Sequence, residues 1–279
     1  MNNTNPSVSN LNSLRNCPLT SRIFSMQLND FVFAVGFVPG SRPLISRVAN
    51  AEGEALTIAP NTWVEIKGAN LAATGHTRIW QAPDFTNNLM PTTLDGVSAT
   101  VNGKPADVYY ISPAQVNILT PPDTAAGQAQ VILTNNGTAS LPFAVTAQVE
   151  SPSFFVFNGG PYVAAQHIDW SLLSPAALYP GYTTPAKPGE TVVLWANGFG
   201  TTSVPVVAGT VTQSGVLSPL PVIKIGGMAA EVQFAGLVAP GEFQFNVVVP
   251  ASTADGDQTI TASYAGLTTQ TGTLIAVQH

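Results

Sequence analysis

The side chains most able to do acid–base or metal chemistry are three histidines, and their positions argue against either role. His76, His167 and His279 are far apart in the sequence, and none belongs to an HxH or HExxH spacing that would place two ligands together. The single cysteine, Cys17, cannot form an internal disulfide or a cysteine metal site. We therefore expect no metal site and no cofactor: His279 is expected to be a frayed C-terminal residue, His76 to lie in a polar loop, and His167 to make a surface hydrogen bond.

Nucleophilic and paired-carboxylate chemistry is also poorly represented. No G-x-S-x-G motif is present to expose a serine on a sharp turn. Ca²⁺ takes about 6–8 oxygen ligands, so Asp255-Gly256-Asp257 is better explained as a hairpin turn. The carboxylates that could pair for glycoside hydrolysis lie mostly beside turn glycines or prolines, and they are Asp84, Asp95, Asp107, Asp169 and Glu190. We predict no catalytic residues and a protein that is not an enzyme.

Aromatic residues in two long loops are the strongest candidates for binding a ligand. Trp80 and Phe85 fall in the loop 72–91, whereas Trp170, Tyr179 and Tyr182 fall in the loop 167–182. Aromatic side chains on loops can stack on sugars or anchor a protein partner. The alternative is that they cap the ends of their own β-structure.

Two further tryptophans lie in expected strands. Trp63 and Trp195 are most simply packing residues, although the alternation around Trp63 could also turn it outward.

The composition favours extended structure and excludes two classes of partner. Charged residues make up 9% of the chain, against about 25% in an ordinary soluble domain, while there are 24 glycines and 23 prolines. The net charge is −6 and the nine lysines and arginines are scattered, so we expect no nucleic-acid partner. The longest apolar run near the N-terminus, residues 31–38, has eight residues and is too short to span a membrane.

From residue 43 onward, short β-rich runs alternate with clusters of Gly, Pro, Asn and Asp, as in an all-β sandwich. Helical periodicity is not sustained anywhere. The clearest predicted strands are Trp63–Lys67, Val97–Val101, Ala106–Ile111, Gln115–Leu119, Gln130–Thr134, Phe143–Gln148, Thr191–Trp195, Val222–Ile225, Ala230–Phe234, Phe243–Val249, Gln258–Tyr264 and Gly272–Val277.

An internal repeat divides this β-rich part into two copies. Residues 101–110 match 225–234, residues 115–121 match 244–250, and residues 60–66 match 188–194, at offsets of 124, 129 and 128. Both copies carry a two-residue turn suited to positive φ, Asn102-Gly103 and Gly226-Gly227, which predicts type I′ hairpins. The fold class is therefore all-β, with two tandem immunoglobulin-like sandwiches.

The repeat sets the domain boundaries. Residues 1–42 are expected to be a disordered leader or a weak export signal, residues 43–149 the first sandwich and residues 150–279 the second. Arg15 and Arg22 precede the apolar run as in a secretory signal, but Asp30 interrupts and no small-x-small cleavage site follows. The segment between the copies, residues 150–160, carries three phenylalanines, so we expect it to pack on the second sandwich and to restrict the orientation of the two domains.

The combination of motifs resembles an uncharacterised family of bacterial secreted proteins, common in acidobacteria, that is built on paired IPT/TIG-like domains. The residues that carry the resemblance include Lys67-Gly68-Ala69-Asn70-Leu71, Leu94-Asp95-Gly96-Val97, Tyr110-Ile111-Ser112-Pro113, Gly198-Phe199-Gly200 and Gln244-Phe245-Asn246-Val247-Val248-Val249-Pro250. The resemblance implies a place outside the cytoplasm, in secretion or at the cell surface, and a structural or adhesive role without catalytic residues.

Two other functions remain open at this point. The chain could be a carbohydrate-binding module that uses its loop aromatics, or an accessory C-terminal fragment of an exported enzyme. We expect a monomer whose partner is a cell-surface protein or a glycan.

Overall fold

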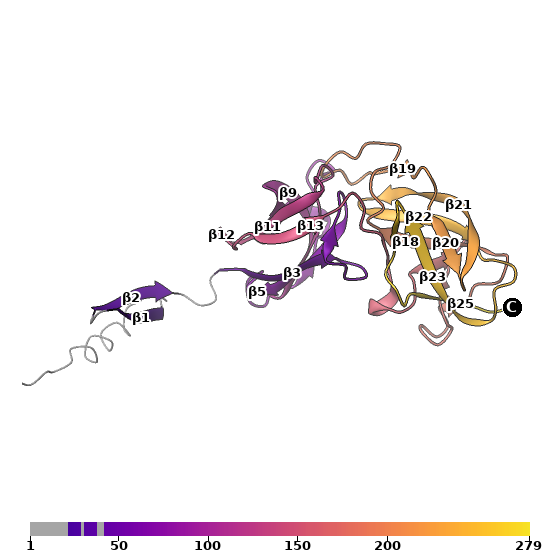
Figure 1. Ribbon diagram of the computed structural model, residues 1–279, viewed down its shortest axis with the longest axis horizontal. Coiled ribbons are helices and arrows are strands. Elements are labelled where there is room, and N and C mark those ends of the chain that lie inside the picture. Colours follow the sequence, from indigo (N-terminus) through magenta and orange to yellow (C-terminus); the bar gives the residue numbers. More distant parts are fainter. Residues whose placement is uncertain (1–21, 29–30, 38–41) are drawn as a thin grey trace, which may run out of the picture. The chain divides into compact units, whose positions relative to one another are not determined.

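The computed structural model describes residues 22–28, 31–37 and 42–279 (Figure 1). Strands β1 (Arg22–Leu28) and β2 (Phe31–Phe37) pair as an antiparallel hairpin. The remainder of the predicted leader, residues 1–21, 29–30 and 38–41, lies outside the described residues. Both predicted sandwiches belong to one separate compact unit, Pro43–His279.

No helix in the described part of the chain is long and apolar enough to cross a membrane.

The first sandwich has two layers that share one strand. The first layer follows the order β3-β5-β10-β9, and the second follows β8-β11-β13-β4. Strand β9 belongs to both, because its first half pairs with β8 and its second half with β10. The elements are β3 (Leu44–Asn50), β4 (Thr57–Ile58), β5 (Trp63–Ala69), β6 (Arg78–Ile79), the 3-10 helix η1 (Ala82–Asp84), β7 (Thr93–Leu94), β8 (Val97–Val101), β9 (Lys104–Ile111), β10 (Gln115–Leu119), β11 (Gly127–Asn135), β12 (Thr138–Ala139) and β13 (Phe143–Ala147).

The second sandwich repeats this plan. One layer follows β17-β16-β15-β18-β22-β21, and β21 also pairs with β20, which in turn pairs antiparallel with β23. The elements are β14 (Ser153–Phe154), the 3-10 helix η2 (Phe157–Gly159), β15 (Ala165–His167), β16 (Leu172–Leu173), β17 (Thr183–Thr184), β18 (Thr191–Asn197), β19 (Gly215–Val216), β20 (Val222–Ile225), β21 (Met228–Ala239), β22 (Glu242–Val248), β23 (Gly256–Tyr264), β24 (Leu267–Thr268) and β25 (Leu274–Val277).

Strand register confirms the duplication. In the first copy Leu119 of β10 lies opposite Trp63 of β5, and in the second Val248 of β22 lies opposite Thr191 of β18. These are the pairs that the sequence offsets of 129 and 128 predict. Both predicted hairpin turns are also confirmed, with positive φ at both central residues of each: 50° and 78° for Asn102-Gly103, and 58° and 79° for Gly226-Gly227.

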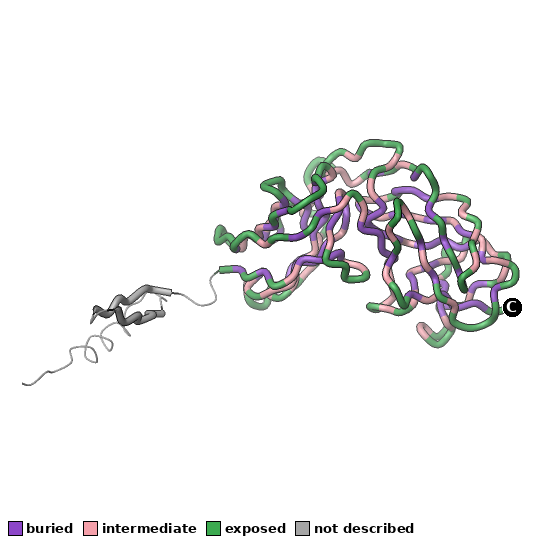
Figure 2. The backbone as a smooth tube through the Cα atoms, in the orientation of Figure 1, coloured by how far each residue is buried: buried purple, intermediate pink, exposed green. Residues whose placement is uncertain are grey.

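Each sandwich has its own apolar core, produced by period-two alternation along its strands. Val64 and Ile66 of β5 are fully buried in the first core, and Phe243, Phe245 and Val247 of β22 fill the second. Figure 2 shows buried backbone inside both sandwiches and exposed backbone at the turns. The prediction that the phenylalanine-rich segment packs on the second domain is confirmed, because Phe154 pairs with Ala196 and is fully buried in the second core.

Candidate functional site

Two fully buried asparagines join the sandwiches directly. Asn197, the last residue of β18, accepts a hydrogen bond at Oδ1 from the backbone N–H of Trp63 at 3.0 Å. Its amide donates to the backbone carbonyl of Trp63 at 3.0 Å and to Oδ1 of Asn50 at 2.9 Å. Because a buried polar group without a partner is costly, this geometry fixes the edge of one sandwich against the other.

Asn50 extends this network into the segment between the domains. Its amide donates to the carbonyl of Ser151 at 2.6 Å, and its Oδ1 accepts a hydrogen bond from the Ser153 hydroxyl at 3.1 Å. Both serines are buried. The connecting segment is therefore part of the packed junction, and the predicted restricted hinge is confirmed.

Further hydrogen bonds and close contacts join the two sandwiches away from the connecting segment. Asn61 donates to Oε1 of Gln213 at 2.8 Å, and the backbone of Met90 donates to the carbonyl of Gly209 at 2.7 Å. Gly241, in the β21–β22 turn, approaches so closely that an added Cβ would lie 2.6 Å from Leu119 Cδ1. Contacts between the two sandwiches thus extend well beyond the connecting segment.

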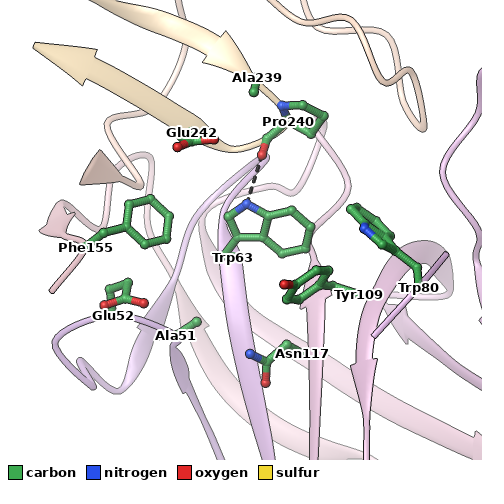
Figure 3. Close-up of a pocket in the computed structure, with 10 residues that line it drawn as sticks. All are labelled: Ala51, Glu52, Trp63, Trp80, Tyr109, Asn117, Phe155, Ala239, Pro240 and Glu242. Atoms are coloured by element: carbon green, nitrogen blue, oxygen red, sulfur yellow. Dashed lines mark hydrogen bonds between the residues drawn. The ribbon is translucent and has the colours of Figure 1, made fainter. Parts of the chain in front are cut away.

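A pocket of about 410 Å³ opens at this junction (Figure 3). Its floor is the outer face of the first sandwich, where Trp63 points away from the core because Val64 and Ile66 point inward. The connecting segment supplies Phe155, and the β21–β22 turn supplies Pro240 and Glu242. The pocket therefore needs both sandwiches to exist.

A β-bulge brings one more aromatic ring to this pocket. The register of β9 against β10 shifts beside Tyr109, which also lines the pocket, and the equivalent shift occurs in the second copy beside Gln233. A bulge re-aims the side chain of its extra residue. In the first copy that side chain is aromatic and meets Trp63, with ring centroids 5.5 Å apart.

The aromatic rings on this side of the pocket form one contiguous cluster. Trp80 lies 5.7 Å from Trp63 and 5.1 Å from Tyr109, in both cases edge to face, and Phe85 lies 5.0 Å from Trp80. The Trp63 indole N–H is already used, because it donates to the Pro240 carbonyl at 2.9 Å. Trp63 is therefore available to a ligand through its ring surface and not through its indole N–H.

Two carboxylic acids line the same pocket without a basic partner. Burial raises the pKa of Glu52 to about 7; a hydrogen bond from the backbone of Val156 partly opposes this rise, and the nearby Glu65 carboxylate adds slightly to it. Burial also raises the pKa of Glu242. Within the described residues neither side chain forms an ion pair.

The structure separates the predicted ligand-binding residues into two groups. Trp80 and Phe85 belong to the aromatic cluster beside the pocket. Trp80 packs on the first core and also lines the pocket. Tyr179 packs on Phe157 at 5.8 Å, as a capping residue would. Trp170 and Tyr182 are 58% and 77% exposed.

Sequence reasoning missed most of the pocket. It assigned no binding role to Tyr109, Phe155, Glu52 or Glu242, and it gave Trp63 only an open choice between packing and facing outward. The alternation that buries Val64 and Ile66 is the one sequence signal that turns Trp63 outward.

Three of the five carboxylates considered for glycoside hydrolysis form ion pairs within the protein. Arg78 bonds both Asp84 and Asp95, at 2.7 Å and 2.8 Å, and these bonds lower the pKa of each acid. Glu190 bonds His167. No group of three potential metal ligands gathers among the residues the structure describes.

Comparison with known proteins finds one domain family and several distant solved structures. The chain matches no curated protein. The extracellular region of plexin A4 is 13% identical with a TM-score of 0.26, and the match covers 95% of this chain and 20% of that one. A mixed-linkage glucan utilisation protein of Bacteroides ovatus, SGBP-B, solved with a heptasaccharide, is 12% identical with a TM-score of 0.35, covering 88% and 50% respectively. The titin tandem A168–A169 is 15% identical with a TM-score of 0.22, covering 85% and 99%.

Identities this low carry no information on ligands or partners, and the chain spans half or less of the first two proteins. Within the chain itself, residues 55–149 match the model of the IPT/TIG domain family.

Proposed function

We propose that this chain is a non-enzymatic, extracytoplasmic structural or adhesion module in which two immunoglobulin-like domains act as one rigid unit. The observation that carries the proposal is the buried junction between the domains, centred on Asn197 and Asn50. Domains that only need tethering are joined by exposed flexible linkers, where few contacts cross. Here the connecting segment itself is buried and hydrogen-bonded.

A fixed angle between domains suits a spacer or an adhesive module. It holds whatever the two ends contact at a constant separation, and it avoids the entropic cost of ordering a flexible hinge when the module binds. The resemblance to secreted bacterial proteins supports a place outside the cytoplasm, as does the match of residues 55–149 to the IPT/TIG family.

Localisation in the source cells tests this proposal. An antibody raised against the full chain should label the outer surface of intact cells or the culture medium after fractionation. Recovery of the protein with a cytoplasmic marker enzyme alone would overturn the extracytoplasmic assignment.

A carbohydrate-binding function is a second candidate, favoured by the exposure of loop aromatics. Trp170 and Tyr182 present more than half of their surface to solvent, and aromatic rings stack on the apolar faces of sugars. A glycan array probed with the full chain and with Trp80→Ala and Trp170→Ala tests this function. Binding that is lost in one of these variants supports it, whereas no tryptophan-dependent signal on any glycan refutes it.

A further inference from the structure

The junction pocket combines ring surface with acids that lack counter-charges. Phe155, Glu52 and Glu242 lie on one side of it, and Trp63 with Tyr109 and Trp80 lies on the other (Figure 3). The volume of about 410 Å³ is within the range of sites that hold small molecules. The ligand must therefore match both the aromatic walls and the two carboxyl groups.

Two hydrogen-bonding groups of the pocket are already used within the protein, which leaves fewer of them for a neutral sugar. The Trp63 indole N–H donates to Pro240, and Oδ1 of Asn117 accepts a hydrogen bond from Gln115 at 2.8 Å. A polyol needs several free donors and acceptors to replace its water. Of the acidic and basic side chains that line the pocket, Glu52 and Glu242 are the two that the structure shows there, and neither has a basic partner among the described residues.

The electrostatics of the pocket call for a positive charge. Trp and Phe ring faces attract cations, and the attraction grows where water is excluded. Arg47 and Lys67, basic residues on the same sheet, pair with Glu54 and Glu65. A bound cation would supply the counter-charge that Glu52 and Glu242 lack, and its attraction would offset the effect of burial that raises their pKa values.

We propose that the junction pocket is a binding site for a compact organic cation, such as a substituted ammonium group, held between Trp63 and Phe155 and neutralised by Glu52 and Glu242. The site does not depend on the adhesive role proposed above. Because its walls come from both sandwiches and the connecting segment, the bound cation would also stabilise the junction.

Titration of the full chain with choline and with its neutral isostere 3,3-dimethylbutan-1-ol tests the proposal, with calorimetry as the readout. Choline should bind about tenfold more tightly than the alcohol, because only the cation gains the ring and carboxylate attraction. Nuclear magnetic resonance should show the Trp63 indole N–H shifting on addition of choline, with the signal assigned from Trp63→Phe.

Charge variants separate a specific site from general attraction to an acidic protein. Glu52→Gln and Glu242→Gln should each weaken choline binding about fivefold or more and leave binding of the alcohol unchanged. Glu231→Gln is the matched control, because it removes one exposed charge outside the pocket and should change neither. Cooperative thermal unfolding at a temperature no lower than that of the unaltered chain would show that each variant is folded.

Three results would overturn the proposal: no binding of choline, equal binding of choline and the alcohol, or equal loss in Glu52→Gln and Glu231→Gln. Binding of cellobiose with a shift of the Trp63 signal, and none with choline, would assign the pocket to sugars instead.

Discussion

Asn197→Ala is the substitution that acts most directly on the junction. It removes an amide that makes three hydrogen bonds at 2.9–3.0 Å and leaves the backbone N–H of Trp63 and the Oδ1 of Asn50 each without one partner. A hydrogen bond contributes about 0.5–1.5 kcal/mol net, and an orphaned buried group costs about 1–3 kcal/mol. We therefore expect the free energy of unfolding of the full chain to fall by about 3 kcal/mol.

Chemical denaturation followed by tryptophan fluorescence and by circular dichroism measures this loss. Asn246→Ala is the matched control, because Asn246 lies on the same layer of the second sandwich, is half-buried and accepts one hydrogen bond, from Gln244. It should cost less than about 1 kcal/mol. Equal small losses in the two variants would refute the reasoning that Asn197 holds the domains together.

Four further substitutions test other parts of the account. Burial raises the pKa of Asp107 from 3.8 to about 7, so the folded state loses stability as pH rises from about 4 to 7. Asp107→Asn should therefore raise the free energy of unfolding by on the order of 2–4 kcal/mol at pH 8 and leave it unchanged at pH 3, as denaturation at both pH values would measure. Gly241→Ala and Gly227→Ala both place a Cβ at positive φ, but only Gly241→Ala puts it 3.0 Å from the Trp63 ring. Urea unfolding should therefore show the free energy of unfolding falling by about 3 kcal/mol in Gly241→Ala and by about 1 kcal/mol in Gly227→Ala. Trp170→Ala should shift the unfolding free energy by no more than about 0.5 kcal/mol, since Trp170 is 58% exposed.

The fold could be predicted from the sequence because its signals are local and repeated. The turns at Asn102-Gly103 and Gly226-Gly227 require positive φ that few other residues adopt, and the matched blocks fix which strands correspond. Strand β3 (Leu44–Asn50) was not predicted, although it pairs with β5 along most of its length.

The site could not be predicted in the same way, because it depends on contacts between residues far apart in the chain. Trp63 meets Asn197 and Pro240 across separations of 134 and 177 residues. Asn197 aligns with Ala69 in the first copy, so the repeat itself gives no hint of its role. Glu52, a turn acid of the first sandwich, and Glu242, a strand acid of the second, come to line one pocket only where the two sandwiches meet.

The distance between the two sandwiches in solution tests the central claim, that they form one rigid unit, most directly. Spin labels at Thr138→Cys and Ser263→Cys, both exposed and one in each sandwich, would be placed in the full chain with Cys17 replaced by serine. Pulsed electron paramagnetic resonance should then give a single narrow distance distribution. A broad or multiple distribution, as for two domains on a flexible linker, would contradict the account.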